Sequence, residues 1–123
     1  MTKTQQALSS EKLADIAIKG IQEKKGNEIV KLDLRKLDHA IADYFIVCHA
    51  NSTTQVSSIA DSVEDEIRKT TGEKPIAVEG KRNGEWVLID FANVMVHVFQ
   101  KEFREHYALE DLWADALIEQ IND

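Results

Sequence analysis

The chain has 123 residues, and its 22 acidic residues outnumber its 15 basic residues to give a net charge of −7. With 43% hydrophobic and 30% charged residues, this composition predicts a single globular domain over residues 1–123 and excludes a mainly disordered chain. The acidic balance disfavours direct binding to a nucleic-acid backbone, although complementary charge still allows docking on a basic protein within a nucleoprotein assembly.

The single cysteine and the first residues of the chain indicate the compartment. Cys48 has no second cysteine with which to form an internal disulfide, so a reducing compartment is expected. Residues 1–6 lack the apolar core of a signal peptide, and no apolar run reaches the roughly 18 residues that span a bilayer. We therefore expect a cytoplasmic protein without a membrane segment.

The first half of the chain predicts the order helix, strand, strand, helix. Apolar residues at helical spacing predict a helix over about residues 10–25. Alternation over residues 30–35 predicts a half-buried strand, and the continuous apolar run over residues 44–48 predicts a strand covered on both faces. Between residues 56 and 67 the apolar positions have offsets of 0, 3, 4, 7 and 11, which predicts an amphipathic helix that ends near Gly72.

The second half predicts three strands and a final helix. Residues 76–78 begin a strand, and Asn83-Gly84 predicts a two-residue hairpin turn in which both residues need a positive φ. The chain returns along residues 86–90 and continues as a strand over residues 93–99. Apolar residues at helical spacing over residues 109–117 predict a C-terminal helix. The predicted fold class is α/β, with a mixed sheet of about five strands flanked by helices.

The motifs of common catalytic folds are absent, because the chain lacks GxGxxG, GxxxxGK[ST] and GxSxG. Cys48 and His49 are neighbours, but adjacent side chains on a strand point to opposite faces, which favours a buried structural cysteine over a thiolate–imidazole pair. The four histidines have no zinc-ligand spacing. We therefore expect no enzyme activity, no cofactor and no metal.

One enzymatic alternative stays open. A metal-dependent nucleotidyl- or phosphotransferase would use Asp43, Asp90 and His97, since carboxylates at strand ends can bind a divalent cation. Asp90 and His97 could share one face of neighbouring strands. A histidine satisfied by a hydrogen bond across the hairpin is the favoured interpretation of His97.

Aromatic residues gather in the last third of the chain. The strand pattern places Trp86, Leu88, Met95, His97 and Phe99 on one sheet face, and Tyr107 and Trp113 follow. Trp and Tyr side chains need partners for their N–H and O–H groups, and they often dominate binding energy at interfaces. The pattern therefore predicts a protein-docking patch. Leu109, Leu112 and Leu117 are expected to be buried where the C-terminal helix covers the sheet.

Three ordered motifs resemble those of the ribosomal silencing factors, also called the Iojap family. The first comprises Asp43-Tyr44-Phe45-Ile46-Val47-Cys48, Asn51-Ser52 and Gln55-Val56. The second comprises Glu79-Gly80, Trp86-Val87-Leu88-Ile89-Asp90-Phe91 and Val94-Met95-Val96-His97-Val98-Phe99. The third is Arg104-Glu105-His106-Tyr107-Ala108-Leu109-Glu110-Asp111-Leu112-Trp113. With the helices around them, these motifs cover about residues 13–115 in the family's order.

The resemblance implies a nucleotidyltransferase-like fold without catalytic activity. It implies a translation repressor that binds the large ribosomal subunit through ribosomal protein fourteen, blocks joining of the small subunit and lowers translation when nutrients are scarce. The partner-binding residues that it implies are Glu79, Trp86, Asp90, His97, Tyr107, Leu109 and Trp113. Trp86 and Tyr107 would be the anchors, while Glu79 and Asp90 would face basic side chains. A homodimer of the free protein through the same patch is also compatible with the sequence.

The chain departs from the family's pattern between its last two strands, where Ala92-Asn93 replaces the usual Gly-Asp. Asn tolerates the left-handed conformation, so we expect Asn93 to preserve the turn. The binding role of the family's aspartate is not transferred to this chain.

Overall fold

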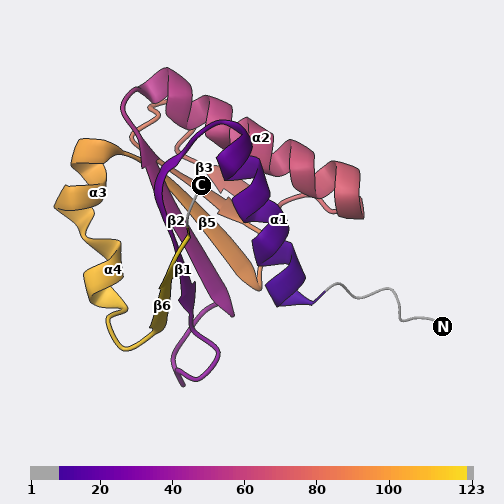
Figure 1. The fold of residues 1–123 in the computed structure, drawn as a ribbon, viewed down its shortest axis with the longest axis vertical. Coiled ribbons are helices and arrows are strands. Elements are labelled where there is room, and N and C mark those ends of the chain that lie inside the picture. The colour runs from indigo at the N-terminus through magenta and orange to yellow at the C-terminus, as the bar shows by residue number, and fades with distance from the viewer. Residues whose placement is uncertain (1–8, 122–123) are drawn as a thin grey trace.

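Two long helices lie on one face of a six-stranded sheet, and two short helices lie on the other (Figure 1). The computed structural model describes residues 9–121. Its helices are α1 (Ser10–Glu23), α2 (Thr53–Thr71), α3 (Lys101–Tyr107) and α4 (Leu109–Leu112). Its strands are β1 (Asn27–Asp33), β2 (Tyr44–Ala50), β3 (Ala77–Glu79), β4 (Trp86–Asp90), β5 (Val94–Gln100) and β6 (Leu117–Gln120).

The sheet has the strand order β3-β4-β5-β2-β1-β6. β2 and β5 are parallel, whereas the other neighbouring pairs are antiparallel. A parallel pair needs a long crossover connection, which α2 and the β3–β4 pair provide here. The α/β class and the mixed sheet are therefore confirmed, and the predicted number of about five strands is corrected to six.

Both long helices begin directly after a serine that caps them. The side-chain oxygen of Ser9 accepts a hydrogen bond from the backbone N–H of Lys12 at 3.2 Å, and Ser52 caps α2 in the same way. α1 ends at Glu23, slightly before the predicted residue 25, and α2 ends at Thr71, with Gly72 as its C-cap residue at a φ of 80°. The buried residues of α2 are the predicted stripe of Val56, Ile59, Ala60, Val63 and Ile67.

Strand β2 is buried along its whole length, because hydrophobic clusters pack on both of its faces. Tyr44, Ile46 and Cys48 join the helix-side cluster, which lies under α1 and α2. Phe45 and Val47 join the far-side cluster on the opposite face. The far-side cluster consists of Val30, Leu32, Leu34, Phe45, Val47, Phe99 and Leu109. The predicted burial of β2 on both faces is confirmed.

Cys48 and His49 point to opposite faces, as the strand geometry predicts. Cys48 packs in the helix-side cluster, while His49 lies beside Arg104 on the other face. Burial raises the pKa of the Cys48 thiol to about 12, so the thiol stays protonated at neutral pH. Cys48 is thus a structural core residue and not an activated nucleophile.

The connection between β3 and β4 differs from the predicted two-residue turn. The strands pair antiparallel, but the register places Glu79 opposite Leu88, so the connecting loop is longer. Positive φ angles occur at Gly80 (88°) and Gly84 (69°) and not at Asn83. The backbone N–H of Gly84 donates to the carbonyl oxygen of Gly80 at 3.0 Å. Two glycines therefore make a wider loop than the Asn-Gly pair alone predicts.

The left-handed residue between β4 and β5 is Ala92, with a φ of 73°, so the expectation that Asn93 takes this conformation is wrong. The N–H of Ala92 donates to a carboxylate oxygen of Asp90 at 2.7 Å. A left-handed conformation costs a non-glycine residue about 1–2 kcal/mol, and the hydrogen bond to Asp90 helps to offset that strain.

The predicted C-terminal helix over residues 109–117 is wrong in its second half. The chain turns at Ala108, which has a φ of 47°, between α3 and α4, and then forms β6. β6 pairs antiparallel with β1 and places Ile118 opposite Leu32. Leu112 and Leu117 are 75% and 64% exposed, so their predicted burial is wrong as well. Pairing with the open edge of β1 outweighs the local helical pattern, which carries no information about that edge.

None of the helices described in residues 9–121 has the length and hydrophobicity of a membrane span. α2 is the longest of them at 19 residues, and only one of its faces is buried. Residues 1–6, which the sequence predicts not to form a signal peptide, lie outside the described residues.

Gly80 is expected to tolerate no larger side chain. A Cβ at this position would overlap the backbone carbonyl oxygen of Trp86, and the φ of 88° adds left-handed strain. We expect Gly80→Ala to lower the free energy of unfolding by about 2–4 kcal/mol in urea titrations. Gly72→Ala is the control, because Gly72 has a similar φ but open space around it, so its loss should be about 1 kcal/mol. Equal losses in the two variants would contradict the close approach at Trp86.

Candidate docking surface

Alternate residues of β4 and β5 form a surface on the sheet face opposite α1 and α2. The register places Trp86 opposite Phe99 and Leu88 opposite His97. The residues between them, such as Val87 and Val98, belong to the helix-side cluster. We define the aromatic face as Trp86, Leu88, Met95, His97, Phe99 and, from α3, Tyr107. The predicted gathering of the first five residues on one sheet face is confirmed.

Trp86 is the centre of the aromatic face. Its ring stacks on Phe99 with a centroid separation of 5.0 Å, and it lies against Tyr107 at 4.9 Å. Trp86 is half-buried, and Tyr107 is 46% exposed. Aromatic pairs at such separations contribute about 0.5–1.5 kcal/mol beyond the burial of their area. Trp86 and Tyr107 thus form a partly exposed surface that is held from below by a fully buried ring.

His97 lies within the sheet face and is only 4% exposed. The indole N–H of Trp86 donates to Nδ1 of His97 at 3.1 Å. Since an indole nitrogen can only donate, Nδ1 must accept, and the neutral imidazole carries its proton on Nε2. Burial lowers the pKa of His97 to about 4, so the ring is neutral at physiological pH. The favoured interpretation, a histidine satisfied by a bond across the hairpin, is confirmed for Nδ1.

The two acidic residues predicted at the patch lie at its border. Glu79 is opposite Leu88 in the register, so its side chain is on the same sheet face, and it is exposed. Within residues 9–121 its carboxylate forms no hydrogen bond or ion pair. Asp90 is half-buried, and one of its oxygens accepts from the backbone N–H of Ala92. Glu79 is therefore the freer of the two carboxylates.

The three remaining predicted residues lie in α3, in α4 and directly after α4, and they differ in their accessibility. Tyr107 is exposed beside Trp86, whereas Leu109 is buried in the far-side cluster. Trp113 packs edge-on against Phe45 at 5.5 Å and stacks on His39 at 5.5 Å. Trp113 thus fixes the end of α4 to the sheet, and Tyr107 presents its ring to solvent.

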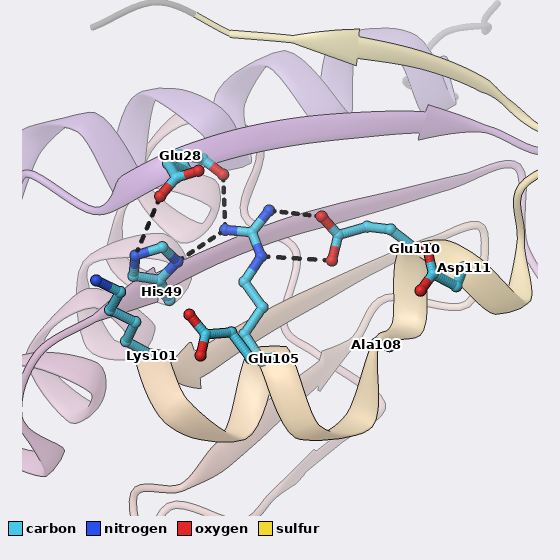
Figure 2. Close-up of a pocket in the computed structure, with 8 residues that line it drawn as sticks. Glu28, His49, Lys101, Glu105, Ala108, Glu110 and Asp111 are labelled. Carbon is cyan, nitrogen blue, oxygen red and sulfur yellow. Dashed lines mark hydrogen bonds and ion pairs between the residues drawn. The ribbon is translucent and has the colours of Figure 1, made fainter.

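A buried arginine fastens α3 and α4 to the sheet (Figure 2). Nη1 of Arg104 donates to the backbone carbonyl of Glu28 at 2.8 Å and to Nδ1 of His49 at 3.0 Å. Nη2 and Nε donate to the two carboxylate oxygens of Glu110 at 2.8 and 3.4 Å. Figure 2 shows Glu28, His49 and Glu110, from three different elements, arranged around this one guanidinium group.

The position of Arg104 depends on an irregularity at the start of β1. Glu28 has a φ of 47°, and the register between β1 and β2 shifts between Asn27 and Val30. A bulge leaves backbone groups without their partners in the ladder. The carbonyl groups of Asn27 and Glu28 accept from Arg104 instead. The arginine therefore both closes the bulge and anchors the helix on which Tyr107 lies.

His49 is neutral in this arrangement. Burial and then the charge of Arg104 lower the pKa of its ring, and the carboxylate of Glu28 opposes them only in part. The neutral ring can accept the Arg104 hydrogen bond at Nδ1 while its Nε2 faces the Glu28 carboxylate at 3.7 Å.

The pocket beside Arg104 has a volume of about 370 Å³ and a charged lining. Its wall includes Lys101, Glu105 and Asp111 as well as the Arg104 network. The guanidinium group is already occupied by its protein partners, so it has little capacity to hold an anionic ligand.

The residues of the transferase alternative do not form one site. Asp43 accepts a hydrogen bond from the hydroxyl of Ser10 at 2.8 Å, Asp90 bonds its own turn, and His97 bonds Trp86. Within residues 9–121 no group of three or more His, Cys, Asp and Glu side chains is arranged to hold a metal ion. Each member of the set thus has a separate structural partner.

Sequence reasoning missed Arg104 and His49 as residues that hold the surface together. Arg104 and Glu110 are six residues apart, which is not a spacing at which side chains meet on one helix. Their contact arises because the chain turns at Ala108. No local pattern marks the bulge at Glu28 either, so this network had no signal in the sequence.

Loss of the Arg104 side chain is expected to destabilise the fold strongly. Arg104→Met keeps the apolar stem but leaves the Glu110 carboxylate and the carbonyl groups of β1 without their donor. We expect the free energy of unfolding, measured by urea titration, to fall by about 3 kcal/mol, as for other broken buried ion pairs. Arg68→Met is the control, because it breaks an exposed pair with Asp65 and should change stability by less than about 1 kcal/mol. Similar losses in both variants would contradict the anchoring role of Arg104.

The burial of neutral His97 predicts a pH dependence of stability. In the unfolded chain its pKa is near 6.5, whereas in the folded protein it is about 4, so only the unfolded state gains a proton between these values. The stability that neutral, buried His97 contributes to the fold is therefore complete above about pH 6.5 and is lost as the pH falls towards 4. We expect the free energy of unfolding, measured by urea titration, to fall by about 2 kcal/mol between pH 7 and pH 5. This fall should be absent in His97→Leu. The pKa of His49 is also lowered in the folded protein, so His49 adds a smaller loss of stability at low pH, and this loss remains in His97→Leu. Identical pH profiles for the two proteins would refute this assignment.

Comparisons with known proteins show the family and the fold that this chain resembles. A family model described as ribosomal silencing factor during starvation (RsfS) matches residues 7–123. Ribosomal silencing factor RsfS of Halalkalibacterium halodurans is 39% identical over 112 residues, which cover 89% of this chain and 92% of that protein. A crystal structure from Chromobacterium violaceum has a TM-score of 0.82 and 33% identity, and the match covers 87% of this chain and 88% of that one.

A more distant relative also bears on function. The mouse protein named mitochondrial assembly of ribosomal large subunit protein 1 is 29% identical over 73 residues, which cover 58% of this chain and 32% of that protein. Ribosomal silencing factors are regulatory proteins and not enzymes. From the family match across nearly all of its length and from relatives above 30% identity, the chain belongs to the ribosomal silencing factor family.

Proposed function

We propose that this protein represses translation by docking its aromatic face on the large ribosomal subunit in the cytoplasm. The partner is ribosomal protein fourteen, as the family resemblance implies, and the bound protein prevents joining of the small subunit when nutrients are scarce. The observation that carries the proposal is the contact between half-buried Trp86 and exposed Tyr107 on the sheet face opposite α1 and α2. The name of the mouse relative, which refers to the large subunit, supports the choice of subunit.

The aromatic face has the composition of a binding hot spot. Trp86 and Tyr107 are of the residue types that most often dominate interface energy, and Leu88 and Met95 lie half-buried in the same sheet face. His97, Leu109 and Trp113 support this surface from within the fold, so they act through the exposed residues.

Charge favours a basic protein as the partner. The chain carries a net charge of −7, and the free carboxylate of Glu79 lies next to Leu88 in the sheet. An acidic surface is attracted to a basic protein and repelled by the phosphate backbone of ribosomal RNA. The docking contact is therefore with a ribosomal protein, with little direct contact to RNA.

The protein acts by binding and not by catalysis. Asp43, Asp90 and His97, the set that a phosphotransferase would need, are each engaged in a separate structural hydrogen bond. Turnover of a nucleotide by the purified protein in the presence of magnesium would overturn this part of the proposal.

Trp86→Ala is the most direct test of the docking surface. We expect the dissociation constant for purified large subunits, measured by cosedimentation, to rise at least about 30-fold, because a central tryptophan anchor contributes about 2 kcal/mol or more. Ile76→Ala is the matched control, because Ile76 is also exposed, at 70%, but lies outside the aromatic face. Its neighbour Ala77 shares the sheet face of Asp90, so the alternation of side chains along the strand puts Ile76 on the opposite face. The affinity of the Ile76→Ala variant for large subunits should stay unchanged.

Two further measurements make this test conclusive. Circular dichroism must show that Trp86→Ala is folded, since a folded variant with full affinity would contradict the docking surface. Light scattering of the same preparations measures self-association, because a homodimer through the aromatic face would compete with the subunit.

A further inference from the structure

His97 contains a buried polar group that the fold does not satisfy. Its Nδ1 accepts the indole N–H of Trp86, so the proton of the neutral ring lies on Nε2. Nε2 is buried and has no hydrogen-bond partner among residues 9–121. A buried donor without an acceptor destabilises the folded state, and a residue with such a defect in a native protein needs an explanation.

The surroundings of His97 would accept an apolar side chain. Its ring packs edge-on against Phe45 with a centroid separation of 4.7 Å, and its neighbour across the parallel pair is Val47. Its neighbour on the other side is Leu88. These contacts are hydrophobic, so a leucine could replace the imidazole without leaving a buried polar atom in its place. Core stability therefore does not account for a histidine at this position.

The one polar bond of His97 is to the residue at the centre of the docking surface. Trp86 is half-buried, and its ring already stacks on Phe99 and contacts Tyr107. Stacking fixes the plane of an indole more strongly than its rotation within that plane, whereas the bond to Nδ1 fixes the direction of the N–H. The His97 ring is itself held from the β2 side by Phe45, which in turn contacts Trp113.

We propose that His97 is a positioning residue, a neutral hydrogen-bond acceptor that sets the indole of Trp86 in its docking orientation at the expense of fold stability. This inference depends on the proposed function, because it assigns His97 a role in the same docking event. Ordering an anchor before binding raises affinity, since less conformational freedom is lost in the complex. Stability and docking affinity should therefore respond independently to changes at His97.

His97→Leu removes the acceptor together with the unsatisfied donor. We expect a thermal midpoint equal to or above that of the wild type, because the variant removes the unsatisfied donor at Nε2 and the half-buried indole of Trp86 is then free to turn its N–H towards water. The dissociation constant for purified large subunits should rise about tenfold. In nitrogen-15 NMR spectra the indole N–H signal of Trp86 should shift and exchange faster with solvent. The signal of Trp113, the other of the two tryptophans, is the internal reference.

His97→Asn is the matched rescue variant. Its side-chain oxygen can occupy the place of Nδ1 and accept from Trp86, but the smaller side chain leaves a cavity and a buried amide N–H₂ group. We expect a lower thermal midpoint than in the wild type, an indole signal close to the wild-type position, and affinity within about threefold of the wild type. The pair of variants thus separates docking from stability, since a merely structural role would make both properties change together.

Three outcomes would overturn the inference. Full affinity of His97→Leu would show that the acceptor does not position Trp86 for docking. Loss of affinity in both variants in proportion to their loss of stability would make His97 an ordinary core residue. Absence of large-subunit binding by the wild type would overturn the proposed function and with it the docking role of His97. Only this last outcome affects the wild type, so the two failures are distinguishable.

Discussion

Helices cover the two faces of the sheet to different extents, and the rest of the structure depends on that difference. α1 and α2, with 14 and 19 residues, cover the helix-side cluster, whereas α3 and α4 have only 7 and 4 residues. β2 lies in the middle of the sheet and is buried on both sides, but β4 lies nearer the edge. The outer face of β4 therefore keeps part of its side chains at the surface. An aromatic residue is suited to such a place, because its ring buries a large area and its polar edge can still find a partner.

Two polar contacts give this partly covered face a defined shape. Arg104 holds the short helices against the bulge of β1, and this brings Tyr107 beside Trp86. His97 directs the indole of Trp86 from within the sheet. The Arg104 and His97 side chains are themselves buried, so both contacts are partly shielded from water. In the proposed function they preorganise the docking surface, so that little binding energy is spent on ordering it.

Sequence patterns predicted the regular elements well because their periodicities are local. The stripe of α2, the alternation in β5 and the apolar run of β2 each follow from spacing alone, and the register of β4 and β5 brought Trp86 and His97 together as expected. Contacts between elements that are far apart in the chain could not be predicted from these local patterns. β6 forms because β1 offers an open edge, and Arg104 meets Glu110 because the chain turns at Ala108. The alternation placed His97 on the aromatic face but could not tell an exposed contact from a buried support, since burial depends on the cover provided by other elements.

Hydroxyl-radical footprinting of side chains would test the central claim, that the aromatic face is the surface in contact with the large ribosomal subunit. Radicals modify aromatic and sulfur-containing side chains in proportion to their exposure, so mass spectrometry of the free and subunit-bound protein reports each residue separately. The docking model predicts that modification of Trp86, Met95 and Tyr107 falls sharply in the complex, while modification of exposed Ile76 stays the same. Unchanged modification of Trp86 and Tyr107, with new protection on α1 or α2, would contradict it.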